Sequence, residues 1–169
     1  MTTSALTTIS LDVSDHIATI TINRPDVLNA FNDDLSREFI DALKQVARDD
    51  DVRVVVITGS GRAFSSGQDL GDLEAKYVPG HVPAFGEDLK KRYDPWVTLI
   101  RTMEKPVIAA VNGVAAGAGC SLALACDIRI ASEHAKFIEV FVNVGLVPDS
   151  ASTWTLPRLV GLGRAMELC

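Results

Sequence analysis

The stretch KPVIAAVNGVAAGAGCSLALACDIRIA, residues 105–131, contains the pattern that decides the fold class. Residues 106–112 form an apolar run with the length of a buried strand, and three glycines within residues 113–119 mark a turn. Residues 120–126 predict a buried helix, and residues 128–132 predict a second strand. This succession of strand, turn, helix and strand is typical of a layered α/β architecture.

The amino-terminal half shows two further patterns. β-Branched residues alternate with polar ones in two short runs, which predicts a hairpin across Ser14-Asp15. Apolar residues then recur at helical spacing behind a possible capping residue, Asn32 or Asp33, and a continuous apolar run of the kind buried on both faces follows. The predicted segments are hairpin strands at 7–13 and 17–23, a helix at 32–49, a strand at 53–58 and a loop at 59–70.

The rest of the chain continues the alternation of strands and helices. Its Pro and Gly residues make the polar segment 71–86 a predicted mobile loop. A helix is predicted over 87–103, a short strand over 136–138 and a further helix that starts within 150–153. The last residues, 161–169, begin an amphipathic helix.

The composition is that of a globular domain. Of the 169 residues, 47% are hydrophobic and 22% are charged, which predicts one domain over residues 1–169. A net charge of -6 without a cluster of Lys and Arg argues against nucleic acid or an anionic membrane as a partner. No apolar run approaches the length of a membrane span and the amino terminus lacks a secretory leader, so we expect a cytoplasmic protein. The three cysteines form no CxxC pair and the three histidines are scattered, so no metal site is predicted.

The glycine loop permits three interpretations. In the first, Gly113, Gly117 and Gly119 form a nicotinamide-binding turn, and Glu133 could meet a ribose hydroxyl. The absence of a Tyr-x-x-x-Lys pair, and the position of the loop in the second half of the chain, argue against such a dehydrogenase. In the second, a backbone N–H at the start of the helix and another from loop 64–69 stabilise an oxyanion. In the third, the glycines only allow close packing of helix and strand.

Four stretches carry a family resemblance: NRPDVLNAF (23–31), GRAFSSGQDL (61–70), KPVIAAVNGVAAGAGCSLALACDIRIA (105–131) and AKFIEVFVNVGLVPDSASTWTLPRLVG (135–161). Together they cover nearly the whole chain, which resembles the enoyl-CoA hydratase/isomerase family, also called the crotonase family. The resemblance implies an α/β crotonase-like spiral of strand-strand-helix turns. Because family members continue into a C-terminal helical region, the chain is expected to be an amino-terminal fragment.

The resemblance also implies a substrate and a set of site residues. The substrate is an acyl-CoA thioester, no cofactor is needed beyond the coenzyme A that the substrate carries, and the full-length protein forms a homotrimer or a dimer of trimers. By position in the motifs, the backbone N–H groups of Gln68 and Ala118 hold the thioester oxygen. The implied substrate and CoA contacts are Val27, Leu28, Ser66, Asp69, Leu70, Gly117 and Phe141. The family often has a lysine where this chain has Asp26, and the nearby cation, Arg24, could instead have a structural role at the strand end.

The acid-base groups decide which reaction the family site performs. Loss of the α-proton from a thioester gives an enolate whose charge lies on the held oxygen. The resemblance places the two glutamates of the hydratases at Ser121 and Phe141, and Glu139 cannot simply replace the second one. Asp149 stands where isomerases carry a proton-moving aspartate, including those of phenylacetate catabolism that convert an epoxide to an oxepin and shift enoyl double bonds. The residues alone also fit Asp149 as a helix cap, and a hydratase or a non-catalytic acyl-CoA-binding protein remain alternatives.

Overall fold

The structure, a computed structural model, describes residues 6–71 and 85–169. The strands are β1 (Ile9–Ser14), β2 (Ile17–Ile22), β3 (Val54–Gly59), β4 (Ala63–Ser65), β5 (Val107–Val111), β6 (Val114–Ala116), β7 (Ile128–Ala131) and β8 (Lys136–Ile138). The helices are α1 (Asp33–Arg48), α3 (Phe85–Arg92), α4 (Asp94–Thr102), α5 (Ala118–Ala125), α6 (Ser152–Val160) and α7 (Leu162–Leu168). Two short 3-10 helices are η1 (Pro25–Val27) and η2 (Val140–Val144). Among these described helices, none has the length and apolar character needed to cross a bilayer.

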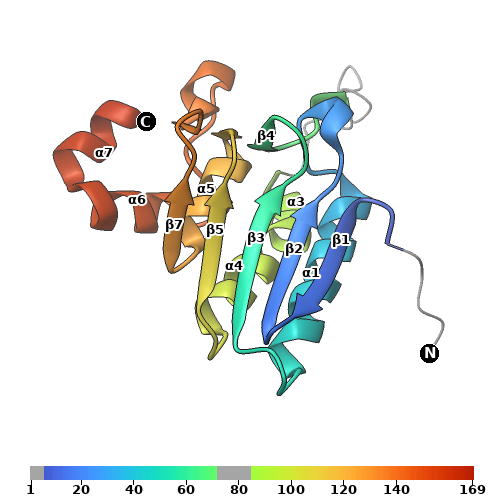
Figure 1. Ribbon diagram of the computed structural model, residues 1–169. Helices are drawn as coiled ribbons and strands as arrows, with labels where there is room; N and C mark the ends of the chain where they lie inside the picture. The colour runs from blue at the N-terminus through green and yellow to red at the C-terminus, as the bar shows by residue number, and fades with distance from the viewer. Residues whose placement is uncertain (1–5, 72–84) are drawn as a thin grey trace.

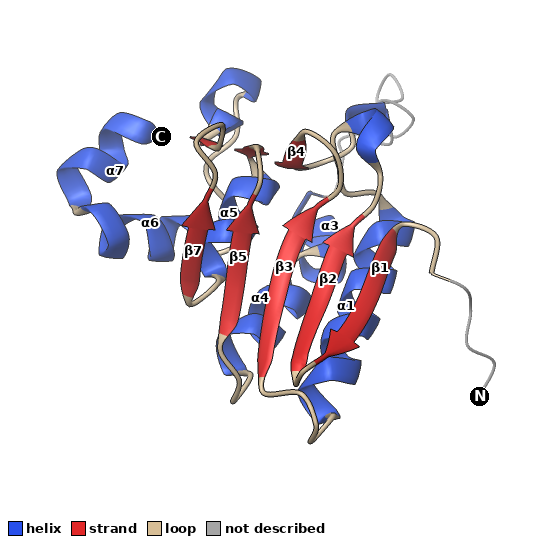
Figure 2. Cartoon of the chain, viewed as in Figure 1, coloured by secondary structure: helices blue, strands red, loops and turns tan. Residues whose placement is uncertain are grey.

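Five strands form the main sheet in the order β1-β2-β3-β5-β7 (Figure 1). The first two strands form the predicted antiparallel hairpin, and the other neighbours are parallel. The hairpin turns at Asp15 and His16, whose φ angles of 51° and 67° suit a tight turn between right-twisted strands. Helices α1, α3, α4 and α5 lie on the same side of this sheet (Figure 2).

A second, smaller sheet has the order β4-β6-β8, and all three strands are parallel. Each of the long strands β3, β5 and β7 is followed along the chain by one short strand of the second sheet and then by a helical segment. The chain therefore winds in strand-strand-helix turns that contribute one strand to each sheet. This is the α/β spiral that the family resemblance implies.

The core lies between the main sheet and the helices that cover it. Helix α1 begins after Asn32, whose side chain accepts a 2.9 Å hydrogen bond from the backbone N–H of Leu35, so the predicted helix and its Asn32 cap are confirmed. Below the cap, the rings of Phe31 and Phe39 meet edge to face at 5.9 Å, and Trp96 from α4 packs against both. This aromatic cluster fixes the position of Phe31, which contacts the candidate site.

Two predicted segments have a different structure. The helix expected over 87–103 is divided into α3 and α4, because Pro95 lacks an N–H and its ring prevents a continuous helix. Strand β3 was expected to be buried on both faces, but Val54 and Val56, which alternate with buried residues, are only half-buried. The predicted mobile loop at 71–86 lies almost entirely outside the described residues.

Two short strands were absent from the sequence prediction. The loop expected at 59–70 contains β4, and the glycine turn expected at 113–119 contains β6. Because a strand separates Gly113 from Gly117, these glycines do not form one phosphate-binding turn. The dehydrogenase interpretation is therefore wrong.

Candidate active site

The site forms at the carboxyl ends of the small sheet. Strands β4, β6 and β8 are parallel neighbours, so the segments that follow them leave the sheet at the same edge. A backbone hydrogen bond of 3.0 Å from the Gly117 N–H to the Ile138 carbonyl continues the pairing beyond the strands. The three segments that meet there are the loop 66–71, the start of helix α5, and η2.

Close backbone contact joins the first two of these segments. A Cβ on Gly119 would lie 2.3 Å from the carbonyl oxygen of Ser65, so only glycine lets the first turn of α5 approach β4 this closely. On the other side of the contact, Gly67 has a φ of 91°, and a Cβ there would lie 3.1 Å from the Ala118 nitrogen. The loop and the amino terminus of α5 are thus in direct contact.

The backbone N–H of Gln68 points away from the segment that anchors its loop. Phe31 donates a 2.7 Å hydrogen bond to the Gly67 carbonyl and accepts one of 2.9 Å from the Asp69 N–H, which makes a parallel bridge with Gln68 at its centre. In an extended bridge of this kind, the N–H of the central residue faces the opposite side. Because Gln68 lines the pocket, we infer that its N–H faces the pocket.

The backbone N–H of Ala118 also lacks an acceptor within its own element. Ala118 is the first residue of α5, so its N–H has no carbonyl partner within the helix. Among the described residues, neither this N–H nor that of Gln68 donates a hydrogen bond. Two unpaired donors in one pocket, one of them at a helix amino terminus, suit an oxygen that gains negative charge.

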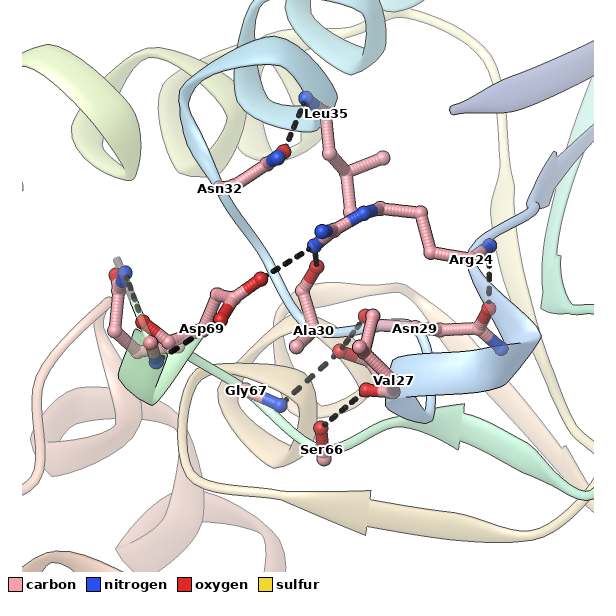
Figure 3. Close-up of polar contacts among 12 residues, drawn as sticks. Arg24, Val27, Asn29, Ala30, Asn32, Leu35, Ser66, Gly67 and Asp69 are labelled. Atoms are coloured by element: carbon pink, nitrogen blue, oxygen red, sulfur yellow. Dashed lines mark hydrogen bonds and ion pairs between the residues drawn. The ribbon is translucent and has the colours of Figure 1, made fainter. Parts of the chain in front are cut away.

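A network of polar contacts anchors the loop that carries Gln68 (Figure 3). Arg24 donates to the carbonyl of Ala30 and forms an ion pair of 2.9 Å with Asp69. The Ser66 N–H donates to the Leu28 carbonyl at 2.9 Å. The guanidinium group of Arg24 therefore binds groups of the protein itself, which agrees with the structural role considered for it.

The pocket has a volume of about 730 Å³. It is lined by Val27, Ala30, Ser66, Gln68, Asp69, Leu70, Gly71, Asp88, Leu89, Tyr93, Gly117, Ala118, Val140, Phe141, Asn143, Val144, Leu146, Val147 and Asp149. Nine of the ten residues that the sequence places at the site lie in this lining. The exception is Leu28, which contributes its carbonyl to the loop anchor instead of a pocket surface.

Asp149 enters the pocket from the turn between η2 and α6. Burial raises the pKa of its carboxyl, a hydrogen bond from Ser150 lowers it in part, and the charges of Glu139 and Asp94 raise it further. The net effect is a pKa above the ordinary value, closer to that of a group that gives and takes protons near neutral pH.

The helix-cap interpretation of Asp149 is wrong. Helix α6 has Ala151 at its N-cap position, in a left-handed conformation, and no side chain caps the helix. The Asp149 carboxylate accepts a hydrogen bond from the Ser150 hydroxyl and lines the pocket. Its position is therefore not explained by helix capping.

Comparison with known proteins identifies the family. The sequence profile described as enoyl-CoA hydratase/isomerase matches residues 12–169. The chain belongs to this family. The 1,2-epoxyphenylacetyl-CoA isomerase of Escherichia coli (strain K12) is 47% identical over 156 residues, which cover 92% of this chain and 59% of the relative. The crotonyl-CoA hydratase of Syntrophomonas wolfei subsp. wolfei is 42% identical over 163 residues, 95% of this chain and 60% of the relative.

Solved structures of family members have the same fold. The enoyl-CoA hydratase of Bacillus anthracis matches with a TM-score of 0.87 and 34% identity, over 96% of this chain and 62% of that one. The enoyl-CoA hydratase of Mycobacterium avium subsp. paratuberculosis K-10 matches with a TM-score of 0.84 and 35% identity, over 98% of this chain and 61% of that one. The chain therefore spans about three-fifths of the length of the relatives and structures that it matches.

The two positions where the family resemblance places hydratase glutamates have other roles in this structure. The Ser121 hydroxyl is buried and donates a 3.1 Å hydrogen bond to the backbone carbonyl of Asp149. Phe141 contributes an apolar surface to the pocket. Glu139 is buried outside the pocket lining, where its Oε1 accepts a 2.6 Å hydrogen bond from Ser152. Neither position provides a carboxylate that could activate water.

Tyr93 is a pocket residue that the sequence did not indicate. It lies at the break between α3 and α4, and its buried hydroxyl donates to the side-chain carbonyl of Gln68. Burial and the charge of Asp149 both raise the pKa of this phenol, which keeps it neutral. No motif marks Tyr93, because its place in the pocket depends on how α4 packs against Phe31 and the loop.

Proposed function

We propose that the protein is an acyl-CoA isomerase that works through a thioester enolate. The thioester oxygen lies between the backbone N–H groups of Gln68 and Ala118. Asp149 removes the proton from the α-carbon, the electron pair of that C–H bond passes to the enolate, and the charge rests on the held oxygen. Return of the proton to another carbon of the acyl chain moves the double bond and regenerates the carboxylate.

The observation that carries the proposal is the use of Ser121. A hydratase needs a carboxylate at that position to activate water, whereas here the Ser121 hydroxyl supports the backbone of Asp149. A single carboxylate can take and return a proton without bound water. Phe141, Val144 and Leu146 line the pocket with apolar surface, which limits the access of water to the enolate.

The same first step could serve two reactions. Double-bond migration and conversion of a ring 1,2-epoxide to an oxepin both begin with loss of the α-proton, from the carbon that lies between the thioester and the ring in the second case. The identity to 1,2-epoxyphenylacetyl-CoA isomerase favours a substrate of the second kind. We propose both activities for the full-length protein. No cofactor enters either reaction, because coenzyme A is part of the substrate.

The experiment compares two activities of the purified full-length protein. We expect conversion of a 3-enoyl-CoA to the conjugated 2-enoyl-CoA, with hydration of a 2-enoyl-CoA at least 100-fold slower, since removal of a general acid-base group costs about 10²–10⁴ in rate. Hydration as fast as isomerisation would contradict the proposal and favour the hydratase alternative. Tight binding of an acyl-CoA without turnover of either substrate would favour a non-catalytic role.

We also propose that the full-length protein is a trimer or a dimer of trimers. Support comes from exposed apolar side chains on β7, α6 and α7, where Ile130, Trp154 and Met166 are 61%, 58% and 72% exposed. Light scattering on the full-length protein measures the assembly directly. A monomer at micromolar concentration would contradict this part of the proposal.

A further inference from the structure

The turn that carries Asp149 has a strained backbone. Ser150 and Ala151 have φ angles of 50° and 67°, so two consecutive residues that are not glycine adopt the left-handed conformation. This conformation is unfavourable for an L-residue with a Cβ. Such strain persists where the surroundings hold it in place, and it is frequent at functional sites.

Hydrogen bonds hold both the backbone carbonyl and the side-chain carboxylate of Asp149 in this turn. The Asp149 carbonyl accepts a bond of 2.9 Å from the Ser152 N–H and one of 3.1 Å from the Ser121 hydroxyl. With this backbone, the hydroxyl of Ser150 lies 2.8 Å from Oδ1 of Asp149 and donates to it. Ser150 is only 6% exposed, so water does not readily replace this contact.

We propose that Ser150 is a positioning residue that holds Oδ1 of Asp149 and leaves Oδ2 as the atom that carries the proton. The inference rests on the proposed function. In the first step the α-proton moves to Oδ2 while the C–H electron pair enters the enolate. In the second step the same Oδ2–H bond breaks, and the proton joins another carbon. Ser150 keeps its own proton throughout and orients the carboxylate.

The charges around Asp149 make this contact important. The charges that act on the carboxylate are those of Glu139, before η2, and Asp94, at the start of α4. The neutral phenol of Tyr93 and the carboxyl group of Asp88 line the same pocket. Burial and the two acidic neighbours raise the pKa of Asp149, and the Ser150 hydrogen bond is the contact that opposes them. Loss of the hydroxyl is therefore expected to raise the pKa of Asp149 further.

The test is the pH dependence of kcat/KM in three variants of the full-length protein. Ser150→Ala removes the hydroxyl and keeps the strain, and Ser150→Gly removes both. Ala151→Gly is the matched control, since it relieves the same kind of strain one residue away and keeps the hydroxyl. We expect the acid limb of the profile to move to higher pH in both Ser150 variants, with kcat roughly 10-fold lower and KM within about twofold of wild type. The Ala151→Gly profile should match that of wild type.

Two results separate this inference from the function on which it rests. If Asp149→Asn abolishes isomerisation but both Ser150 variants keep the wild-type acid limb, the role of Ser150 is overturned and the proposed function stands. If Asp149→Asn remains active, the proposed function itself fails. Should Ser150→Ala fold poorly, Ser150→Gly still decides the question, because it carries no left-handed strain. Thermal unfolding of each variant checks that the compared proteins are folded.

Discussion

Replacing Gly67 by alanine changes the space between the two N–H donors without removing either of them. The added Cβ would lie 2.7 Å from the Ala116 carbonyl oxygen and 3.1 Å from the Ala118 nitrogen. Both distances are shorter than ordinary van der Waals contact, so the loop and the amino terminus of α5 must move apart. This movement would separate the N–H groups of Gln68 and Ala118.

The expected magnitude has a conformational and a steric part. Left-handed backbone at a residue with a Cβ costs about 1–2 kcal/mol, and an overpacked contact costs about 1–3 kcal/mol more. We therefore expect the free energy of unfolding to fall by about 2–5 kcal/mol in Gly67→Ala. Displacement of one donor from an oxyanion is expected to lower kcat by about 10²–10³.

The matched control is Gly161→Ala. Gly161 has a φ of 82°, close to that of Gly67, but a Cβ there meets nothing within 4 Å. It should lose stability through strain alone and keep its kcat. Urea unfolding measures the stability of each variant, and isomerisation of a 3-enoyl-CoA measures kcat. A folded Gly67→Ala protein with kcat within twofold of wild type would refute the assignment of these two N–H groups to the oxyanion site.

Substitutions at three other residues test the loop anchor, the contact to Gln68 and the stability of the fold. Arg24→Met should raise KM and lower kcat about 10-fold, because the loop loses its ion pair to Asp69. Arg24→Lys should restore part of the activity, and equal activity of wild type and both variants would show that the anchor is unimportant. Tyr93→Phe should lower kcat several-fold in wild type and have no effect in Gln68→Leu, so equal effects in both backgrounds would exclude action through Gln68. Burial alone would raise the pKa of Glu38, but hydrogen bonds from Thr7 and Thr8 outweigh burial and lower that pKa. These hydrogen bonds therefore stabilise the folded protein at pH values above the ordinary pKa of a carboxyl group, and the stabilisation is lost as the pH falls through the lowered pKa. Glu38→Gln should therefore unfold about 1–3 kcal/mol more easily at neutral pH and match wild type in acid, and a difference that persists in acid would contradict this reasoning.

Local patterns predicted the elements whose residues interact with near neighbours. The hairpin β1-β2 and helix α1 follow from alternation, helical spacing and the Asn32 cap, all of which are visible within a short window. Strands β4 and β6 were missed because each has only three residues and lies between glycines that predict a loop or a turn. They become strands because β6 pairs with β4 on one side and with β8 on the other, and this pairing joins segments far apart in the sequence.

The candidate site likewise contains residues that local motifs predict and features that depend on tertiary packing. Motif positions placed Gln68, Ala118 and Asp149 in advance, and the structure brings all three into one pocket. The sequence could not exclude Asp149 as a helix cap, because the left-handed backbone at Ala151 is a product of tertiary contacts. The role of Tyr93 was hidden for a similar reason, since it depends on the packing of α4.

The most direct test of the central claim is Asp149→Asn in the full-length protein. Asparagine keeps the shape of the side chain and an oxygen that can accept from Ser150, but it cannot carry the α-proton. We expect isomerisation of a 3-enoyl-CoA to fall by about 10²–10⁴ while the affinity for a non-reactive acyl-CoA stays within about threefold. Retained isomerisation in this variant would contradict the claim that Asp149 moves the proton.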